Sequence, residues 1–115
     1  MTQLSKRLYD LEPRTQKFAL AVRDFLGNVP KSTVNNEYVK QLARSSGSIG
    51  ANYIEANEAL GKKDFAMRLR ICRKETKETI YWLNLIQSSD PDTCKILIKE
   101  AGELTAILGS VISKL

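Results

Sequence analysis

Apolar residues recur along most of the chain at alternating spacings of three and four, which places them on one face of an α-helix. A first helix is predicted to begin near Asp10, with Pro13 in its opening turn, and to end in the segment 27–30. Leu4 and Leu8 continue its stripe backwards, so an earlier start stays open. The predicted buried stripe of this helix consists of Leu11, Phe18, Val22 and Phe25.

The same spacing predicts a second helix from about Thr33 or Asn36 to Leu60. Gly61 follows as a left-handed stop, because glycine adopts positive φ without steric cost. The predicted seam of this helix is Val39, Leu42, Ser46, Ile49, Tyr53, Ala56 and Leu60.

Two more helices follow. The third is predicted from about Lys63 to Ser88. Asp90 then caps a fourth helix, with Pro91 at its first position, that continues to near Leu115. The predicted seams are Phe65, Leu69, Cys72, Thr76, Thr79, Leu83 and Ile86 in the third helix, and Cys94, Leu97, Ala101, Leu104, Leu108, Val111 and Leu115 in the fourth.

Four long helices with short connections predict an all-α protein, folded as an up-down-up-down four-helix bundle. No Gly-rich linker or break in composition divides the 115 residues, so we expect a single domain covering residues 1–115. No apolar run has the length of a signal peptide or a membrane span. A cytoplasmic protein with no membrane partner is therefore expected.

Composition limits the chemistry. The net charge is +5, from 18 Lys and Arg against 13 Asp and Glu, which permits an anionic partner without requiring one. Histidine is absent from the sequence, and Cys72 and Cys94 lack the spacing of a zinc or redox motif. Both cysteines are expected to be reduced, buried thiols, and no metal or cofactor is predicted.

The segment 41–54 of the second helix carries only one charged residue, Arg44. Beside its apolar seam runs a small-residue column formed by Ala43, Gly47, Gly50 and Ile54. Glycine inside a helix costs up to about 1 kcal/mol relative to alanine, so two glycines in one column indicate close backbone packing. A helix that hides more than one face indicates self-association.

Another column of this helix is polar but nearly uncharged. On the third helix, Glu75 and Glu78 share a column with apolar residues, so we expect both to be at least partly buried. A buried carboxylate needs a partner, and Arg44 is the best candidate. The predicted structural polar network, which is not an active site, consists of Arg44, Ser48, Asn52, Glu55, Glu75 and Glu78.

A combined motif extends through the second and third helices. It consists of Gln41-Leu42, Arg44-Ser45, Ser48-Ile49, Ala51-Asn52-Tyr53, Glu55-Ala56, Lys63-Asp64-Phe65, Lys74-Glu75, Glu78-Thr79 and Tyr81-Trp82-Leu83. With YDLEPRT and FLGNVP in the first helix, it resembles the four-helix-bundle family of 23S rRNA intervening-sequence proteins. In the last helix only the helical pattern matches.

This resemblance implies four-helix bundles assembled into a barrel-shaped homopentamer. The family also includes accessory proteins of diversity-generating retroelements, which bind nucleic acid and associate with a reverse transcriptase. Other members have no settled activity, so the resemblance predicts the fold better than the function.

The strongest binding signal is a basic stripe. Residues 62–77 carry seven basic side chains, of which Arg70, Arg73, Lys74 and Lys77 share one broad helical face. Such a face can contact the phosphates of RNA or DNA, with salt-sensitive and largely sequence-independent affinity. The alternative is a solvated face paired with nearby acids. No aromatic residue interleaves the stripe, so single-strand specificity is not supported.

Carboxylates spaced three apart offer an enzymatic alternative, because such pairs can share a divalent ion. Magnesium-dependent nucleotide pyrophosphohydrolases with all-helical folds use similar pairs. Any glutamate-rich helix also produces this spacing by chance. The pairs are Glu55 and Glu58, Glu75 and Glu78, and Glu100 and Glu103.

The sequence thus predicts a non-catalytic, oligomeric scaffold or adaptor that binds nucleic acid through the basic stripe, together with a protein partner such as a reverse transcriptase. A purely protein-binding module is the first alternative, and a pyrophosphohydrolase the second. Tyr53, Tyr81 and Trp82 are interpreted as core or interface packing.

Overall fold

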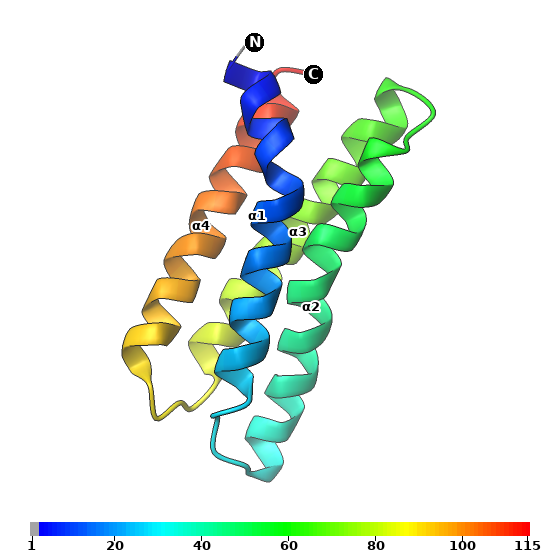
Figure 1. Cartoon of the computed structure of the whole chain (residues 1–115). Coiled ribbons are helices and arrows are strands. Elements are labelled where there is room, and N and C mark those ends of the chain that lie inside the picture. The colour runs from blue at the N-terminus through cyan, green and yellow to red at the C-terminus, as the bar shows by residue number, and fades with distance from the viewer. Residues whose placement is uncertain (1–2) are drawn as a thin grey trace.

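The computed structural model describes the chain from residue 3 to residue 115, and its side chains from residue 10 onward. Over this range the chain forms four helices: α1 (Gln3–Leu26), α2 (Thr33–Asn57), α3 (Lys62–Leu85) and α4 (Pro91–Ser113). Figure 1 shows them running alternately up and down with short connections at the ends. The prediction of an all-α, up-down-up-down four-helix bundle is confirmed.

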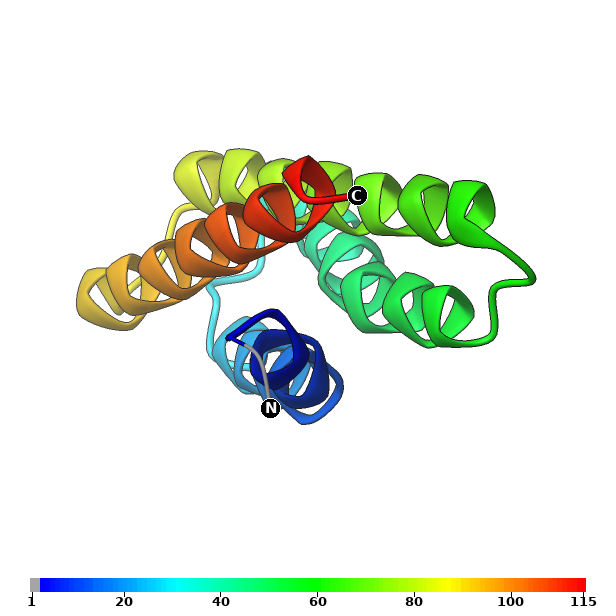
Figure 2. The same cartoon turned by 90° about the horizontal axis from the view of Figure 1, so that it is seen from above.

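The helices pack around the bundle in chain order, and α4 closes it by returning to α1. The contact between α2 and α3 is the most extensive, and that between α1 and α4 the least. Seen from above, α3 and α4 lie side by side, and α1 lies on the opposite side of the bundle from α3 (Figure 2). The result is an elongated bundle of 44 × 23 × 19 Å.

The predicted seams form the core. The prediction is wrong for two seam residues. Leu60 is 100% exposed and Leu115 is 38% exposed, because both lie beyond the ends of their helices. The buried apolar residues are Leu11, Phe18, Val22, Phe25, Leu42, Ile49, Tyr53, Ala56, Leu69, Cys72, Leu83, Ile86, Cys94, Leu97, Ala101, Leu104, Leu108 and Val111.

The first helix begins earlier than expected. Its backbone is helical from Gln3, so Pro13 lies inside α1 and Asp10 is not its cap. A proline within a helix removes one backbone donor and disturbs the preceding turn. Here Pro13 is exposed, which leaves its ring in water rather than in the core. The side chains of Leu4 and Leu8, which suggested the earlier start, lie outside the described side chains.

The connection between α2 and α3 also differs from expectation. α2 ends at Asn57 rather than Leu60, and Gly61 is the extended N-cap of α3, with φ −174° and ψ 174°. Gly61 is therefore not a left-handed stop. A short turn closes α2 instead, where the Glu58 N–H donates to the Glu55 carbonyl (3.2 Å) and the Ala59 N–H to the Ala56 carbonyl (3.1 Å).

A buried asparagine explains why α3 stops at Leu85 and not at Ser88. Asn35, only 3% exposed, donates through its amide to the carbonyl oxygens of Pro30 and Gln87, both at 2.9 Å. Its own oxygen accepts the Gln87 N–H at 3.1 Å. These bonds satisfy backbone groups at the end of α3 and tie together the α1–α2 and α3–α4 connections.

Capping fixes the starts of α2 and α4. Ser32 accepts the Asn35 N–H at 3.0 Å, and Asp90 accepts the Thr93 N–H at 3.1 Å, with Pro91 at the first position as predicted. In the part of the chain that the structure describes, the helices lack the combination of length and apolar character needed to cross a membrane.

Candidate functional site

The four predicted basic residues share one groove on the outside of the α3–α4 pair. We call this the basic groove: it has a volume of about 580 Å³ and is lined by Arg70, Arg73, Lys74, Lys77, Gly109, Ile112 and Ser113. The four cations stand at positions i, i+3, i+4 and i+7 of α3, which lie on one side of a helix. All four are exposed.

A glycine on α4 shapes the groove beside Arg73. A methyl group at Gly109 would lie 3.3 Å from the Arg73 Nε and 3.9 Å from its Cδ. The missing side chain at this position therefore gives the Arg73 side chain room to lie against α4. By contrast, a methyl group at Gly102, two turns earlier, would meet no atom within 4 Å.

The cations of the basic groove form no ion pair among the described side chains, although the charge of Lys74 helps to lower the pKa of Glu78, one turn along α3. The ion pairs formed by side chains from residue 10 onward involve Arg14, Arg23, Lys40 and Arg44, and none involves a groove residue. Four like charges in one groove repel one another and attract an anion. The arrangement can bind phosphates by charge and hydrogen bonding.

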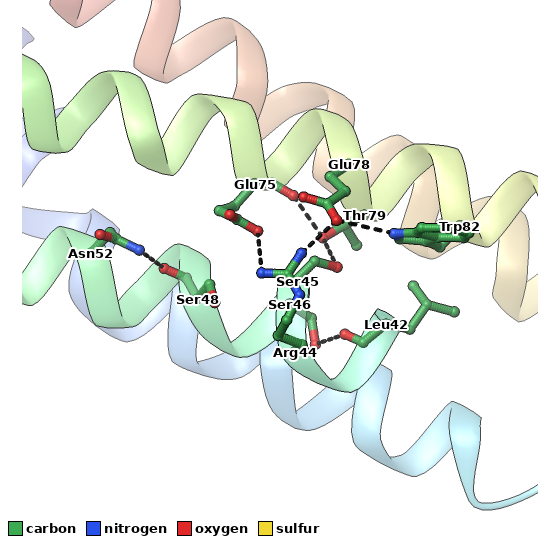
Figure 3. Close-up of polar contacts among 10 residues, drawn as sticks. All are labelled: Leu42, Arg44, Ser45, Ser46, Ser48, Asn52, Glu75, Glu78, Thr79 and Trp82. Atoms are coloured by element: carbon green, nitrogen blue, oxygen red, sulfur yellow. Dashed lines mark hydrogen bonds and ion pairs between the residues drawn. The ribbon is translucent and has the colours of Figure 1, made fainter. Parts of the chain in front are cut away.

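On the other side of α3 the charges are paired. Arg44 of α2 bridges Glu75, at 3.4 Å from its Nη1, and Glu78, which it binds through Nη2 (Figure 3). We call these three residues the Arg44 cluster. The Glu75 side chain is 9% exposed, that of Glu78 31%, and that of Arg44 48%. The indole N–H of Trp82 donates to the same Glu78 oxygen at 3.3 Å.

These contacts shift the ionisation of the cluster. The hydrogen bond from Arg44 lowers the pKa of Glu78, against the opposing effect of burial, and Trp82 adds to the lowering. Reciprocally, the Glu78 carboxylate raises the pKa of Arg44. Both groups are therefore held in their charged forms, as expected for a structural ion pair.

Three residues of the predicted polar network do not join the Arg44 cluster. Ser48 contributes its backbone carbonyl, which accepts from the Asn52 amide at 2.9 Å within α2 (Figure 3). Glu55 is exposed. Ser48 and Asn52 are half-buried, so this part of the polar column is only partly covered by the rest of the bundle.

A buried pair of hydroxyl groups, from Ser45 and Thr79, lies between α2 and α3 beside the Arg44 cluster. The Thr79 hydroxyl lies 2.9 Å from the Ser45 hydroxyl and donates to the Glu75 carbonyl at 2.8 Å (Figure 3). Both side chains are fully buried. Thr79 was predicted in the seam, whereas Ser45 was named only within the family motif and was assigned neither to the seam nor to the polar network. Its signal is its position next to the seam residue Ser46.

Arginine side chains bind two of the three predicted carboxylate pairs, Glu75 with Glu78 and Glu100 with Glu103. Arg14 of α1 holds Glu100 through two hydrogen bonds of 2.8 Å and reaches Glu103 at 3.4 Å. This interaction, which the sequence analysis missed, joins α1 to α4. Across the described residues, no three Asp, Glu, Cys or His side chains are grouped so that they could hold a metal ion.

The small-residue column divides into two parts. A methyl group at Gly50 would lie 3.1 Å from the Thr15 Oγ1 of α1, so this glycine permits a close approach within the bundle. At Gly47 a methyl group would meet no atom within 4 Å, and Ile54 is 51% exposed. Packing within the chain therefore accounts for Gly50 but not for Gly47.

Both cysteines are buried free thiols. Cys72 donates to the Ile49 carbonyl at 3.4 Å, and burial raises its pKa to about 12. Cys94 donates to the Leu83 carbonyl at 3.3 Å, and burial raises its pKa as well. Thiolates, the reactive form, are therefore disfavoured at both positions.

Comparison with known proteins gives a consistent family. The profile of 23S rRNA-intervening sequence proteins matches residues 10–110. Among solved structures, the chain is similar to a protein of unknown function from the S23 ribosomal protein family of Bacteroides thetaiotaomicron, with 28% identity and a TM-score of 0.78. That similarity covers 93% of this chain and 98% of the other. No curated protein matches the sequence.

Proposed function

The chain belongs to the 23S rRNA-intervening sequence protein family, and we propose that it is a non-catalytic adaptor that binds nucleic acid through the basic groove. The observation that supports this proposal is the gathering of Arg70, Arg73, Lys74 and Lys77 in one groove, without an ion pair to any described carboxylate. The solved relative is itself a protein of unknown function, so the groove carries the proposal.

The physical argument is one of charge. Solvated basic residues on a helix usually find acidic neighbours at i±3 or i±4, as Lys40 does with Glu37. In the basic groove, Arg70, Arg73 and Lys77 have cations or uncharged residues at these spacings, and only Lys74 has an acidic one, Glu78, which Arg44 already binds. The cations therefore repel one another across a surface that α4 completes. A polyanion placed there relieves this repulsion and releases its condensed counterions, which makes affinity strongly dependent on salt.

The test is a pair of double charge reversals. Arg73→Glu with Lys77→Glu removes the groove charge, while Lys31→Glu with Lys95→Glu makes the same change in net charge elsewhere. Lys31 lies in the α1–α2 connection and Lys95 in the first turns of α4, and Asn35 ties the connections at that end together. Fluorescence anisotropy with labelled RNA and DNA measures the affinity.

We expect the groove variant to lose at least tenfold in affinity and the control variant to change by less than twofold to threefold. Equal losses in both variants would mean that only the net charge matters. No binding by the unaltered protein at low salt would overturn the proposal and favour a module that binds protein alone.

The adaptor is proposed to assemble from several copies, with a homopentamer as the expected form. Two shallow grooves along α1 and α2 share Ala19 and Gly47. No described atom lies close enough to Gly47 to require a glycine there. A second chain packed on this face would supply such a close neighbour. Light scattering on nuclease-treated protein should give about five times 12.9 kDa, and a monomer would contradict the assembly.

The non-catalytic part of the proposal has its own test. In each of the pairs Glu75–Glu78 and Glu100–Glu103, an arginine contacts both carboxylates, and its positive charge opposes the binding of a metal ion. We expect no magnesium-dependent release of pyrophosphate from mixed nucleotides. Activity that Glu78→Gln abolishes would establish an enzyme instead.

A further inference from the structure

We infer that the basic groove and the neighbouring Tyr81 together form a binding surface for a single-stranded polynucleotide, with the Tyr81 ring as a platform on which an unpaired base stacks. This inference rests on the proposed function and narrows it to one class of nucleic acid. It also departs from two expectations from the sequence. The basic stripe was considered only as far as Lys77, with no aromatic residue interleaved, and Tyr81 was interpreted as core or interface packing, whereas it is exposed.

The positions on α3 place Tyr81 in line with the groove cations. Arg70, Lys74, Lys77 and Tyr81 stand at i, i+4, i+7 and i+11, so they follow one stripe along the helix. At 1.5 Å per residue this stripe is about 16 Å long. At the 3.4 Å spacing of a stacked strand, it matches about five nucleotides.

Tyr81 is exposed to solvent, but its ring packs on Trp82, which is itself held by other residues. The Tyr81 residue is 58% exposed, which is unusual for an aromatic side chain in a small bundle. Its ring meets that of Trp82 edge to face, with centroids 5.0 Å apart and planes at 74°. Trp82 in turn packs against Tyr38 at 5.8 Å.

The Arg44 cluster completes this support. The indole N–H of Trp82 donates to Glu78, and Arg44 holds that carboxylate in place. A chain of contacts therefore runs from the paired charges of one α3 face to the exposed ring at the end of the other. A ring held in this way loses little conformational freedom when a base stacks on it.

An exposed aromatic ring beside cations favours a single-stranded nucleic acid over a duplex. A duplex offers the surface its phosphates and base edges but not the faces of its bases, because those bases are already stacked and paired. A single strand offers both phosphates and unpaired bases, and every base has a face that can stack on an aromatic ring. Tyr81 is therefore expected to contribute to single-strand affinity and not to duplex affinity.

The experiment compares Tyr81→Ala, Tyr81→Phe and the control Ile96→Ala on two probes: a labelled oligothymidylate of about 15 nucleotides, and a duplex of the same length. Ile96 is also exposed, at 66%, but lies on α4 away from the basic groove. Tyr81→Ala should weaken single-strand binding about tenfold and duplex binding less than twofold. Tyr81→Phe, which keeps the stacking face, and Ile96→Ala should bind like the unaltered protein.

Emission from Trp82, the single tryptophan of the chain, gives a second measurement. Because Trp82 touches Tyr81, the single strand should change its emission and the duplex should not. An unchanged single-strand affinity in Tyr81→Ala, or an equal loss on both probes, would overturn the inference while leaving the proposed function intact. The proposed function itself would be contradicted by a different result, namely that the unaltered protein binds neither probe.

Discussion

The two charged faces of α3 differ in whether their side chains form ion pairs. Toward α2, Glu75 and Glu78 both contact Arg44, which offsets one of their two negative charges at a partly buried position. Toward α4, the four cations of the basic groove form no ion pair with a described carboxylate. Paired charges that are partly buried contribute to stability, whereas unpaired exposed charges are free to contribute to binding.

The largest expected effect comes from the same substitution made on each face. Arg44→Met should lower the free energy of unfolding by about 2 kcal/mol, because it leaves the buried Glu75 carboxylate unpaired. The loss is smaller than the ~3–5 kcal/mol of a fully buried pair because Arg44 is half exposed. Arg70→Met, in the basic groove, should change the free energy of unfolding by less than about 0.5 kcal/mol.

Urea denaturation of both variants measures this difference. Equal stability of the two variants would remove the distinction between the faces.

A second comparison separates the buried hydroxyl pair from the polar column predicted beside it. Thr79→Val keeps the shape of the side chain but leaves the buried Ser45 hydroxyl without this partner, at a cost of about 1 kcal/mol. Asn52→Ala, which removes only a bond within α2, should be neutral or slightly stabilising. Thermal melts followed by circular dichroism test both. A larger loss from Asn52→Ala would restore the column to the network.

Glycine substitutions on α4 give a smaller contrast. Gly102→Ala should stabilise the protein by up to about 1 kcal/mol, because alanine favours the helix and its methyl group meets no neighbour. Gly109→Ala should stabilise it less and weaken nucleic-acid binding, because its methyl group presses on Arg73. Stability and affinity are measured on both variants. Identical behaviour of the two would show that Arg73 does not depend on the space at Gly109.

Acid provides the mildest expected effect. The folded-state pKa of Glu78 is lowered by Arg44, and that of Glu100 by Arg14, so the unfolded chain binds more protons below about pH 4.5. The stability that these pairs supply is complete above that pH and is lost as the pH falls through the lower folded-state pKa values. Glu78→Gln should flatten the acid side of the stability curve.

Much of this fold follows from the spacing of apolar residues. Leu42, Ile49, Leu69 and Leu104 could be assigned to the core because the period of a helix determines which residues share a face. Helix ends could not be predicted as well. The end of α3 depends on Asn35, 52 residues away in sequence, and no local pattern shows that two connections are neighbours.

The charged residues show the same division. Arg44 could be matched with Glu75 and Glu78 because a carboxylate among apolar residues needs a cation. The bond from Arg14 to Glu100 could not, since it depends on how α1 approaches α4 across 86 residues. Likewise, the absence of ion pairs between the basic groove and the described carboxylates depends on how the helices pack, and the sequence alone left a paired, solvated face equally open.

The central claim is that the cations of the basic groove contact phosphates, and the salt dependence of affinity tests it most directly. For a single strand held by the four groove cations of one chain, log K plotted against log salt should have a slope of about −2.8. Replacing Lys74 by alanine should reduce the magnitude of this slope by about 0.7, as one phosphate contact is lost. A slope near zero, or one that Lys74→Ala leaves unchanged, would contradict the account.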